Sequence, residues 1–486
     1  MIYLSLALLP LLCGAQPDSL PSGTVTVGQF GAVGDGETDD TESFQAALDS
    51  VAEVGGTVLV EPVMPGGGYV LTRRVTLPRG TSLIGAAAGM PFFLWEGVDR
   101  ELQRGPVILA RPAESEYLRD ERLPLFHLAG GNTIRGLYIL YDEQPWPSDD
   151  ELRAGDFDGL GSETDFIERF VPERVAPHGP TIMIQAGTAS STVEDITCSR
   201  YYDFLYMPGG GKIVVRRCYL YGYKRAFAGR EVKDTIRISE IHLVPNVQSE
   251  ISWQHSLVHA AITTHPDNIA FDFAEVDGFS VTDVTAFLVH TGFKLGASEA
   301  HPFVDPVTGE QVWTEWGTTA WGSISNIKLD NCAVGFDCVM GTILPNQLSN
   351  IMVHVSIDPG QKLTLGGEEL AHQAAFLIRP DFAGATLQVS NLSISSFAPT
   401  RVAANAAMVH QAGGRAFIID CPSGMPPKDY ASRDQAHIDI HGLVVSNIDE
   451  AHLLATSPGT VAGISVEGFV HNGRPVLAPW VDGNPR

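Results

Sequence analysis

The sequence predicts an all-β chain built as a single-stranded parallel β-helix, with one helix near the N-terminus as its cap. Three observations predict this class. The 486-residue chain holds 50 glycines and only 18% charged residues, which suits many short strands joined by tight turns. A turn signature recurs with a period near 22 residues, and a column of phenylalanines recurs beside it with the same period.

The turn signature is a polar residue, then Asp, Asn or another polar residue, then usually an aliphatic one. Its members are Glu194-Asp195-Ile196, Arg216-Arg217-Cys218, Ser239-Glu240-Ile241, Thr282-Asp283-Val284, Ser325-Asn326-Ile327, Ser349-Asn350-Ile351, Ser390-Asn391-Leu392 and Ser446-Asn447-Ile448. Asn and Asp suit a bend because they tolerate left-handed backbone angles. Steps of 22 or 23 residues indicate one coil, and steps of 43 residues indicate two coils.

The second column contains aromatic residues that are expected to point inward. It consists of Phe204, Phe227, Phe271, Phe293 and Phe336. In a parallel β-helix each coil buries apolar side chains and stacks on the next at about 4.8 Å, so equivalent positions form ladders. A leucine-rich repeat has a similar length, but its Leu/Asn consensus is absent from this chain.

The segment 24–85 is predicted to form the cap and the first coil. It contains a Gly-rich loop and then one amphipathic helix, whose apolar face consists of Phe44, Ala47, Leu48 and Val51. Asp39 or Asp40 is expected to cap the helix, with Glu42 at the capping-box distance from Asp39. The first coil of a solenoid exposes apolar core and an unpaired strand edge, so we expect this helix to cover it.

The same segment carries a resemblance to a known family. The runs Phe30–Gly36, Thr38–Thr41 and Phe44–Ala47 resemble the opening of the pectate-lyase-like superfamily, which includes rhamnogalacturonase-, epimerase- and tailspike-type proteins. This resemblance implies a right-handed, single-stranded parallel β-helix and a polysaccharide partner. Members of that superfamily hydrolyse, eliminate, epimerise or only bind glycans, so the resemblance implies no single reaction. It also implies a monomer or a homotrimer.

Composition and the N-terminus bear on partners and location. A net charge of −26 argues against nucleic acid and against an anionic membrane surface as partner. Residues 1–15 read as a secretory signal peptide, because the apolar run is too short to span a bilayer and ends in small residues. We therefore expect a secreted protein, extracellular or periplasmic, without membrane insertion.

The rest of the chain, residues 24–486, is predicted to be one β-helix domain. Two loop insertions, 141–180 and 297–313, break its repeat, and long loops on a rigid scaffold are where binding usually occurs. The five cysteines left after the leader contain no CxxC pair. We expect them to be small buried side chains, with neither a disulfide framework nor a metal site.

The residue that follows each inward phenylalanine should point outward, since side chains alternate along a strand. This rule gives a column of ionisable residues at steps of 21 or 22: Glu250, Asp272, Lys294, Glu315 and Asp337. The column is predicted to supply the catalytic groups, with Glu315, Asp337 and Asp272 as carboxylates and Lys294 between them. Solvated surface ion pairs are the alternative reading of the same stripe.

The predicted spacing within this column fits glycoside hydrolysis. Glu315 and Asp337 on neighbouring coils would be about 5 Å apart, as in retaining glycosidases, whereas Asp272 and Glu315 would be about 9.5 Å apart, at the inverting end of the range. Three tryptophans lie beside Glu315, and indole faces stack well on sugar rings. Trp313, Trp316 and Trp321 are therefore expected to contact the substrate, together with Glu250, and packing of the tryptophans under a loop is the alternative.

A glycoside hydrolase without a cofactor is thus the favoured function, and two alternatives stay open. In a polysaccharide lyase, Lys294 or an arginine would abstract a proton, and Ca²⁺ held by the acidic stripe would neutralise a uronate. A glycan-binding or adhesion protein would need no catalysis. The signature residues of polygalacturonase-type members are absent, since Asp149-Asp150 lies in an insertion and His178-Gly179 follows Pro177.

Overall fold

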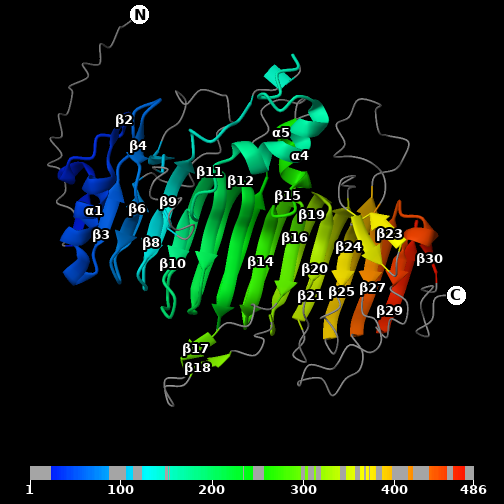
Figure 1. Cartoon of the computed structure of the whole chain (residues 1–486). Coiled ribbons are helices and arrows are strands. Elements are labelled where there is room, and N and C mark those ends of the chain that lie inside the picture. Colours follow the sequence, from blue (N-terminus) through cyan, green and yellow to red (C-terminus); the bar gives the residue numbers. More distant parts are fainter. Residues whose placement is uncertain are drawn as a thin grey trace, which may run out of the picture.

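The computed structural model is an elongated stack of parallel strands, with the N-terminal part at one end and the C-terminal part at the other (Figure 1). It describes residues 23–86, 105–112, 123–147, 151–152, 154–233, 235–244, 257–296, 302–304, 311–313, 319–339, 346–355, 362–365, 368–371, 373–378, 386–396, 414–419, 437–456 and 463–476. The predicted parallel β-helix is confirmed by the strand pairing, which is parallel throughout the main stack apart from its last pair and one isolated bridge near its start.

Strand pairing forms three ladders that run along the stack. The first contains β1 (Thr24–Thr26), β3 (Thr57–Val60), β6 (Ser82–Gly85), β9 (Thr133–Leu140), β11 (Thr192–Met207), β12 (Ile213–Val232), β13 (Ile236–Leu243), β15 (Phe279–Phe287), β19 (Ser323–Cys332), β21 (Asn346–Val355), β25 (Thr386–Ser396), β27 (His437–Ser446) and β29 (Gly463–His471), which ends against the antiparallel β30 (Arg474–Pro475). The second starts with β2 (Asp35–Asp39), β4 (Gly68–Leu71) and β7 (Val107–Ala110), and continues through the C-terminal part of β9, the middle of β11 and β12, and the C-terminal part of β13.

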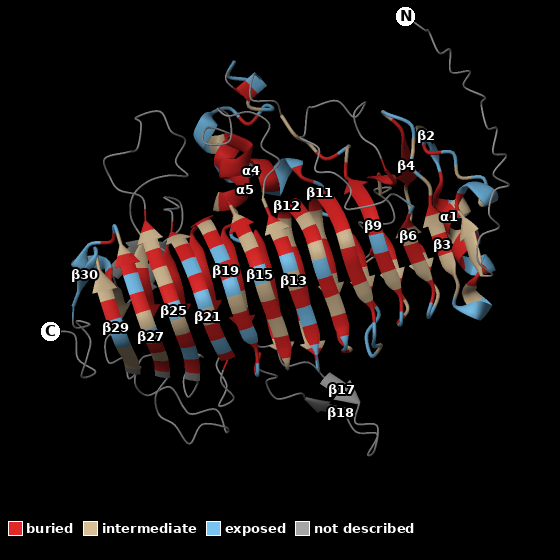
Figure 2. Cartoon of the chain, turned by 180° about the vertical axis from the view of Figure 1, so that it is seen from behind, coloured by how far each residue is buried: buried red, intermediate tan, exposed pale blue. Residues whose placement is uncertain are grey.

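The third ladder positions the candidate site. It contains β5 (Val75–Leu77), β8 (Phe126–Leu128), β10 (Ile182–Ile184), the C-terminal parts of β11 and β12, β14 (Ile269–Val276), β16 (Thr291–Gly296), β20 (Val334–Cys338), β24 (Ala374–Ile378), β26 (Arg415–Ile419) and β28 (Leu454–Thr456). Buried and more exposed positions alternate along many strands of the stack, as expected for coils with an apolar interior (Figure 2).

The recurrent turn signature marks the corner between the first two ladders. Its middle residues have left-handed backbone angles, for example Asp195 with φ 54° and Asn350 with φ 54°. Side-chain amides join successive coils, since Asn350 Nδ2 donates to Asn326 Oδ1 at 3.0 Å and Asn391 Nδ2 donates to Asn350 Oδ1 at 3.0 Å. Asn447 also has a left-handed backbone, with φ 59°, but it lies outside this column, because His441 pairs with Ser390 and thereby aligns Gly442 with Asn391.

The phenylalanine column is confirmed from Phe227 onward and extends beyond the predicted residues. Successive rings stack at 5.0 Å (Phe227–Phe271), 4.5 Å (Phe271–Phe293), 5.1 Å (Phe293–Phe336), 4.8 Å (Phe336–Phe376) and 5.6 Å (Phe376–Phe417). Phe204 is not in register with this column, since Leu205 pairs with Phe227.

A small residue precedes each ring of the column because the coil bends there and two successive side chains face the core. The residues are Ala226, Ala270, Gly292, Gly335, Ala375 and Ala416. A Cβ on Gly292 would lie 2.4 Å from Leu329 Cδ1, and one on Gly335 would lie 2.6 Å from the Ala375 carbonyl oxygen. The bend therefore excludes larger side chains at these two positions.

The N-terminal helix α1 (Thr41–Ser50) forms where it was predicted, and Phe44, Ala47 and Leu48 are buried in the main core. Of the two predicted caps, Asp39 accepts a hydrogen bond from the backbone N of Thr41, the first residue of the helix, at 3.0 Å. The Asp40 carboxylate instead accepts hydrogen bonds from Val33 N at 2.7 Å and Gly34 N at 3.1 Å. Glu42 pairs with Arg73 at 2.6 Å. Asp40 thus stabilises the conformation of the Gly-rich loop. That α1 covers the first coil of the β-helix stays a prediction.

Two further helices, α4 (Glu163–Arg174) and α5 (Leu257–Thr264), pack against each other beside the start of β14 (Figure 1). They share a second apolar cluster with Tyr221 and Tyr223 of β12. Two antiparallel hairpins, β17 (Pro302–Val304) with β18 (Gln311–Trp313) and β22 (Lys362–Leu365) with β23 (Glu368–Ala371), interrupt the coils. Short 3-10 turns lie at Gly28–Phe30, Ala52–Val54 and Glu450–His452.

The insertions and cysteines can be compared with the sequence predictions. Residues 163–174 of the first insertion form α4, and the second contains the β17–β18 hairpin. Cys198, Cys218, Cys332 and Cys338 are buried, as predicted, whereas Cys421 lies outside the described residues. Within the described part of the chain, every helix is too short or too polar to cross a membrane.

Candidate functional site

Asp272, Lys294 and Asp337 form a continuous row across three neighbouring strands of the third ladder. Asp272 of β14 pairs directly with Lys294 of β16, and Lys294 pairs directly with Asp337 of β20. Each residue follows an inward phenylalanine and therefore lies on the outer face, as predicted. Both carboxylates are only 6% exposed, and Lys294 is half-buried. We call these three residues the charged row.

The register corrects the predicted column at two points. Ala228 of β12 is the neighbour of Asp272, so no coil containing Glu250 precedes it. Lys294 has Asp337 as its neighbour, so the coil expected through Glu315 is absent. The repeat length alone suggested this coil, but the two strands described between β16 and β19, β17 and β18, pair with each other and not with the stack. Glu250 and Glu315 themselves lie outside the described residues.

Register also determines the spacing of the carboxylates. Because neighbouring strands lie about 4.8 Å apart, Asp272 and Asp337 are separated by roughly 9.5 Å, with Lys294 midway. Among the described residues no ion pair within 4.0 Å joins Lys294 to either carboxylate.

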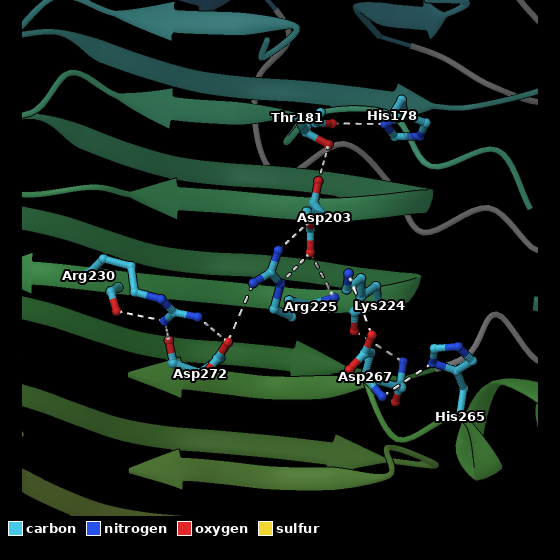
Figure 3. A network of polar contacts seen from close by, with 12 residues as sticks. His178, Thr181, Asp203, Lys224, Arg225, Arg230, His265, Asp267 and Asp272 are labelled. Carbon is cyan, nitrogen blue, oxygen red and sulfur yellow. Dashed lines mark hydrogen bonds and ion pairs between the residues drawn. The ribbon is translucent and has the colours of Figure 1, made fainter. Parts of the chain in front are cut away.

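Two arginines of β12 reach Asp272 from the neighbouring strand (Figure 3). Arg230 Nη2 donates to Asp272 Oδ2 at 2.5 Å, while its Nη1 donates to the Asp272 carbonyl oxygen at 2.8 Å. Arg225 Nη1 lies 3.5 Å from the same Oδ2. Asp272 is thus a largely buried carboxylate that two cations hold in place.

Asp203 of β11 completes this network on the other side of Arg225. Arg225 Nε and Nη2 each donate to one oxygen of the Asp203 carboxylate, both at 2.8 Å. Thr181 in turn donates to the Asp203 carbonyl oxygen from its backbone N at 2.9 Å and its hydroxyl at 3.2 Å. Burial of the Arg225 guanidinium opposes its charge, but the hydrogen bonds and charges of Asp203 and Asp272 prevail and raise the pKa of Arg225.

The spacing rule does not find Asp203, Arg225 or Arg230. The rule counts from the phenylalanine column with strict alternation, whereas Ala226 and Phe227 both face the core, so Arg225 points outward two positions before the ring. One signal was available in the sequence. Asp203 and Arg225 carry opposite charges one coil apart, and their strands pair in that register.

A second polar group lies at the α5 end of the third ladder (Figure 3). Lys224 Nζ is 3.6 Å from Asp267 Oδ2 and lies over the ring of Tyr202 at 5.0 Å from its centroid. The Asp267 backbone N donates to His265 Nδ1 at 3.3 Å. Burial lowers the pKa of His265, so its imidazole favours the neutral form.

The charged row is bounded by small and apolar residues. Ala228 lies on its N-terminal side, and Leu377 of β24 follows Asp337 in the ladder. Leu377 belongs to an apolar cluster with Val334, Ala374 and Ile418. Ala228 and Leu377 thus delimit the charged row along this ladder.

Of the three tryptophans predicted to contact the substrate, the structure describes the side chain of Trp321 alone. Trp321 is 61% exposed and has a left-handed backbone with φ 52°, which is unusual for a bulky residue. Trp313 is the last residue of β18, whose side chains are not described, and Trp316 lies outside the described residues. Contact with a sugar stays a prediction for all three. Among the side chains that the structure describes, no three His, Cys, Asp or Glu residues converge as a metal site would require.

Comparisons with known proteins agree with this architecture. Residues 24–97 match the family model for rhamnogalacturonase A/epimerase, pectate lyase-like proteins. A comparison with curated protein sequences gives no match.

Two solved structures show the same fold. The hyperthermoactive exopolygalacturonase from Thermotoga maritima is similar with a TM-score of 0.50 and 13% identity, over 94% of this chain and 93% of that one. The Dettilon tailspike protein is similar with a TM-score of 0.50 and 10% identity, over 90% of this chain and 68% of that one. The family match is thus confined to residues 24–97, and the chain as a whole shares the right-handed parallel β-helix fold of these two structures.

Proposed function

We propose that the protein is a secreted enzyme that hydrolyses glycosidic bonds of a polysaccharide at the charged row. One observation carries the proposal: the register places two largely buried carboxylates two strands apart, with a lysine between them. Their separation of roughly 9.5 Å is at the upper end of the range for inverting glycosidases, which leaves room for a water beside the sugar. The retaining pair predicted with Glu315 is set aside, because that coil is absent.

The reaction needs one acid, one base and one water. One carboxyl group donates its proton to the glycosidic oxygen, and the bond between that oxygen and the anomeric carbon breaks. The other carboxylate accepts a proton from the water, whose oxygen forms the new bond to the anomeric carbon from the opposite face. Lys294 can donate hydrogen bonds to sugar oxygens between the two groups, which orients the ring.

Two features outside the row support the substrate class. The similar Thermotoga maritima structure is named as an exopolygalacturonase, so this fold supports glycan hydrolysis in at least one case. The leader-like residues 1–15 suit an enzyme that meets polysaccharide outside the cytoplasm. Whether the enzyme is monomeric or trimeric stays a prediction.

A lyase is the second candidate, and Lys294 favours it. A half-buried lysine between two carboxylates, without an ion pair to either among the described residues, has the position of a base that removes a proton next to a uronate carboxyl group. Ca²⁺ would then be expected to assist. Elimination forms an unsaturated sugar that absorbs in the ultraviolet, whereas hydrolysis does not.

A panel of neutral and acidic polysaccharides tests these candidates with the full chain. Hydrolysis predicts new reducing ends without ultraviolet absorbance, and without loss of activity on adding EDTA. Absorbing products that EDTA suppresses would establish the lyase instead. Binding to a glycan without any product would replace both with an adhesion function.

A further inference from the structure

Trp321 lies at a corner of the β-helix, between the third ladder and the first, where successive coils share a left-handed backbone. Strand register aligns eight residues at this corner. They are Gly55 (φ 64°), Gly80 (79°), Gly131 (66°), Ser190 (67°), Lys212 (53°), Thr235 (68°), Gly278 (65°) and Trp321 (52°). The first seven are glycine, serine, lysine or threonine. Trp321 is the aromatic member of this set.

The backbone of Trp321 is strained without a gain in packing. A left-handed backbone costs free energy in a residue with a Cβ, because the Cβ crowds the following carbonyl oxygen, and it is a marked outlier for a bulky residue. The Trp321 side chain is nevertheless 61% exposed, and in the described part of the structure no aromatic ring or cation contacts its indole. Strain that persists without such contacts points to a functional role.

Resting on the proposed function, we propose that Trp321 is a secondary binding site, separate from the charged row, for a sugar ring of the polysaccharide. The indole face stacks on the apolar face of a sugar ring. The neighbouring corner residues suit the hydroxyl edge of a sugar, since Gly278 has no side chain and Thr235 is exposed with a hydroxyl group. A protein partner would instead require an apolar, water-excluding surround for the indole.

The position of the corner separates this site from the charged row. Trp321 follows Lys294 in the same coil, because the Thr319 hydroxyl donates to the Gly296 carbonyl oxygen and the chain then enters β19. In the preceding coil the corner lies beyond the end of β14, at Val276. Asp272 is four residues before that end, which is about 13 Å at the rise of a parallel strand. One sugar ring at the charged row therefore does not reach the indole, whereas a polymer does.

Substrate length tests this separation with the full chain. The measurement compares kcat/KM for the polysaccharide of the panel that the wild type cleaves with kcat/KM for the shortest oligosaccharide of the same glycan that it cleaves. In Trp321→Ala the ratio of the two should fall about threefold to tenfold, because the lost contact is available to the polymer alone. Trp321→Phe should restore part of the ratio. A wild-type ratio in Trp321→Ala would overturn the proposal.

The strained backbone offers a second test, with Lys212→Gly as the matched control. Lys212 occupies the same corner position in an earlier coil and is also exposed. Glycine adopts this conformation without crowding, so Trp321→Gly and Lys212→Gly should both raise the thermal midpoint slightly. Of these two variants, Trp321→Gly should lose binding to the polysaccharide, measured by retardation in a gel that contains it. A midpoint that falls in Trp321→Gly and rises in Lys212→Gly would assign the indole to packing and overturn the proposal.

The outcomes distinguish this inference from the proposed function. Gel retardation reports binding without catalysis, so it decides about Trp321 even if Asp272→Asn retains full activity and the charged row fails. Wild-type retardation of folded Trp321→Ala overturns the secondary site even if the charged row is catalytic. Sedimentation of the same variant shows whether the indole instead joins copies of the chain: a loss of self-association with wild-type retardation also overturns the proposal.

Discussion

Lys294 of β16 pairs directly with Asp337 of β20, although the repeat predicts one more coil between them. The ends of the intervening loop meet, since the Thr319 hydroxyl donates to the Gly296 carbonyl oxygen at 2.8 Å. The third ladder thus continues directly from β16 to β20, and the residues between them add no strand to it. This relationship brings the two carboxylates of the row within two strands of each other, which the proposed reaction requires.

Replacing residues 298–317 with a short Gly/Ser linker should leave the β-helix intact. The ladder from β16 to β20 does not use this segment, and closing a shorter loop costs little entropy. We expect an unchanged circular dichroism spectrum and a thermal midpoint within a few degrees of the wild type. A collapse of the midpoint would mean that the loop supplies a coil of the stack after all.

The phenylalanine column should dominate local stability. Phe293 is fully buried between Phe271 and Phe336, at 4.5 Å and 5.1 Å, so Phe293→Ala should cost about 3–5 kcal/mol. Gly335→Val should also destabilise, because even a Cβ there would lie 2.6 Å from a carbonyl oxygen. Chemical denaturation measures both losses. Met352→Ala on the exposed outer face is the control and should be nearly neutral.

The fold was largely predictable because its signals are periodic. Asp195, Asp283 and Asn326 recur at the corner, and the stacked rings from Phe227 to Phe336 recur in the core. A period reports how a coil repeats, but it does not report when a segment leaves the stack. For that reason the register at Asp272, Lys294 and Asp337 was predicted in part, with Glu250 and Glu315 wrongly inserted.

The contacts of Arg225 and Arg230 with Asp203 and Asp272 were not predicted from the sequence, for a local reason. Ala226 and Phe227 both face the core at the bend, which interrupts the alternation on which outward positions are counted. The predicted caps were likewise right only in part, because Asp39 accepts from Thr41 N whereas Asp40 bonds to the Gly-rich loop. Both cases depend on the backbone conformation at a single residue, which cannot be derived from the composition or from the repeat length.

Buried histidines should make the protein less stable in acid. His259 Nδ1 shares a hydrogen bond of 2.5 Å with the Tyr221 hydroxyl, and burial lowers the pKa of His259 from 6.5 to about 3. Burial also lowers the pKa of His178, to about 4. Between pH 6.5 and these values the unfolded chain binds protons that the folded chain does not, so the free energy of unfolding falls as pH falls.

The measurement is the thermal midpoint at pH 7 and at pH 4.5. His259 alone should account for a loss on the order of 2–3 kcal/mol over that interval. His259→Asn keeps an acceptor near the Tyr221 hydroxyl but cannot titrate, so its midpoint should depend less on pH. An equally steep dependence in this variant would show that other groups cause the acid sensitivity.

Trp321 should contribute to polymer binding. Its side chain is 61% exposed on a left-handed backbone, and an exposed indole can stack on a sugar ring. Trp321→Ala should lower kcat/KM on a polysaccharide about threefold to tenfold, a change that corresponds to one lost aromatic contact. Met352→Ala, which removes another exposed apolar side chain, should have no effect. Equal activity of both variants would remove Trp321 from the site.

The most direct test of the charged row is the rate of reducing-end release by Asp272→Asn and Asp337→Asn. Each variant should lose at least about a hundredfold in kcat, because each removes one partner of the acid–base pair. Asp283→Asn, at the turn corner on another face, is the matched control and should retain full activity. Thermal midpoints near the wild-type value will show that all three variants fold. Undiminished kcat in folded Asp337→Asn or Asp272→Asn would contradict the account.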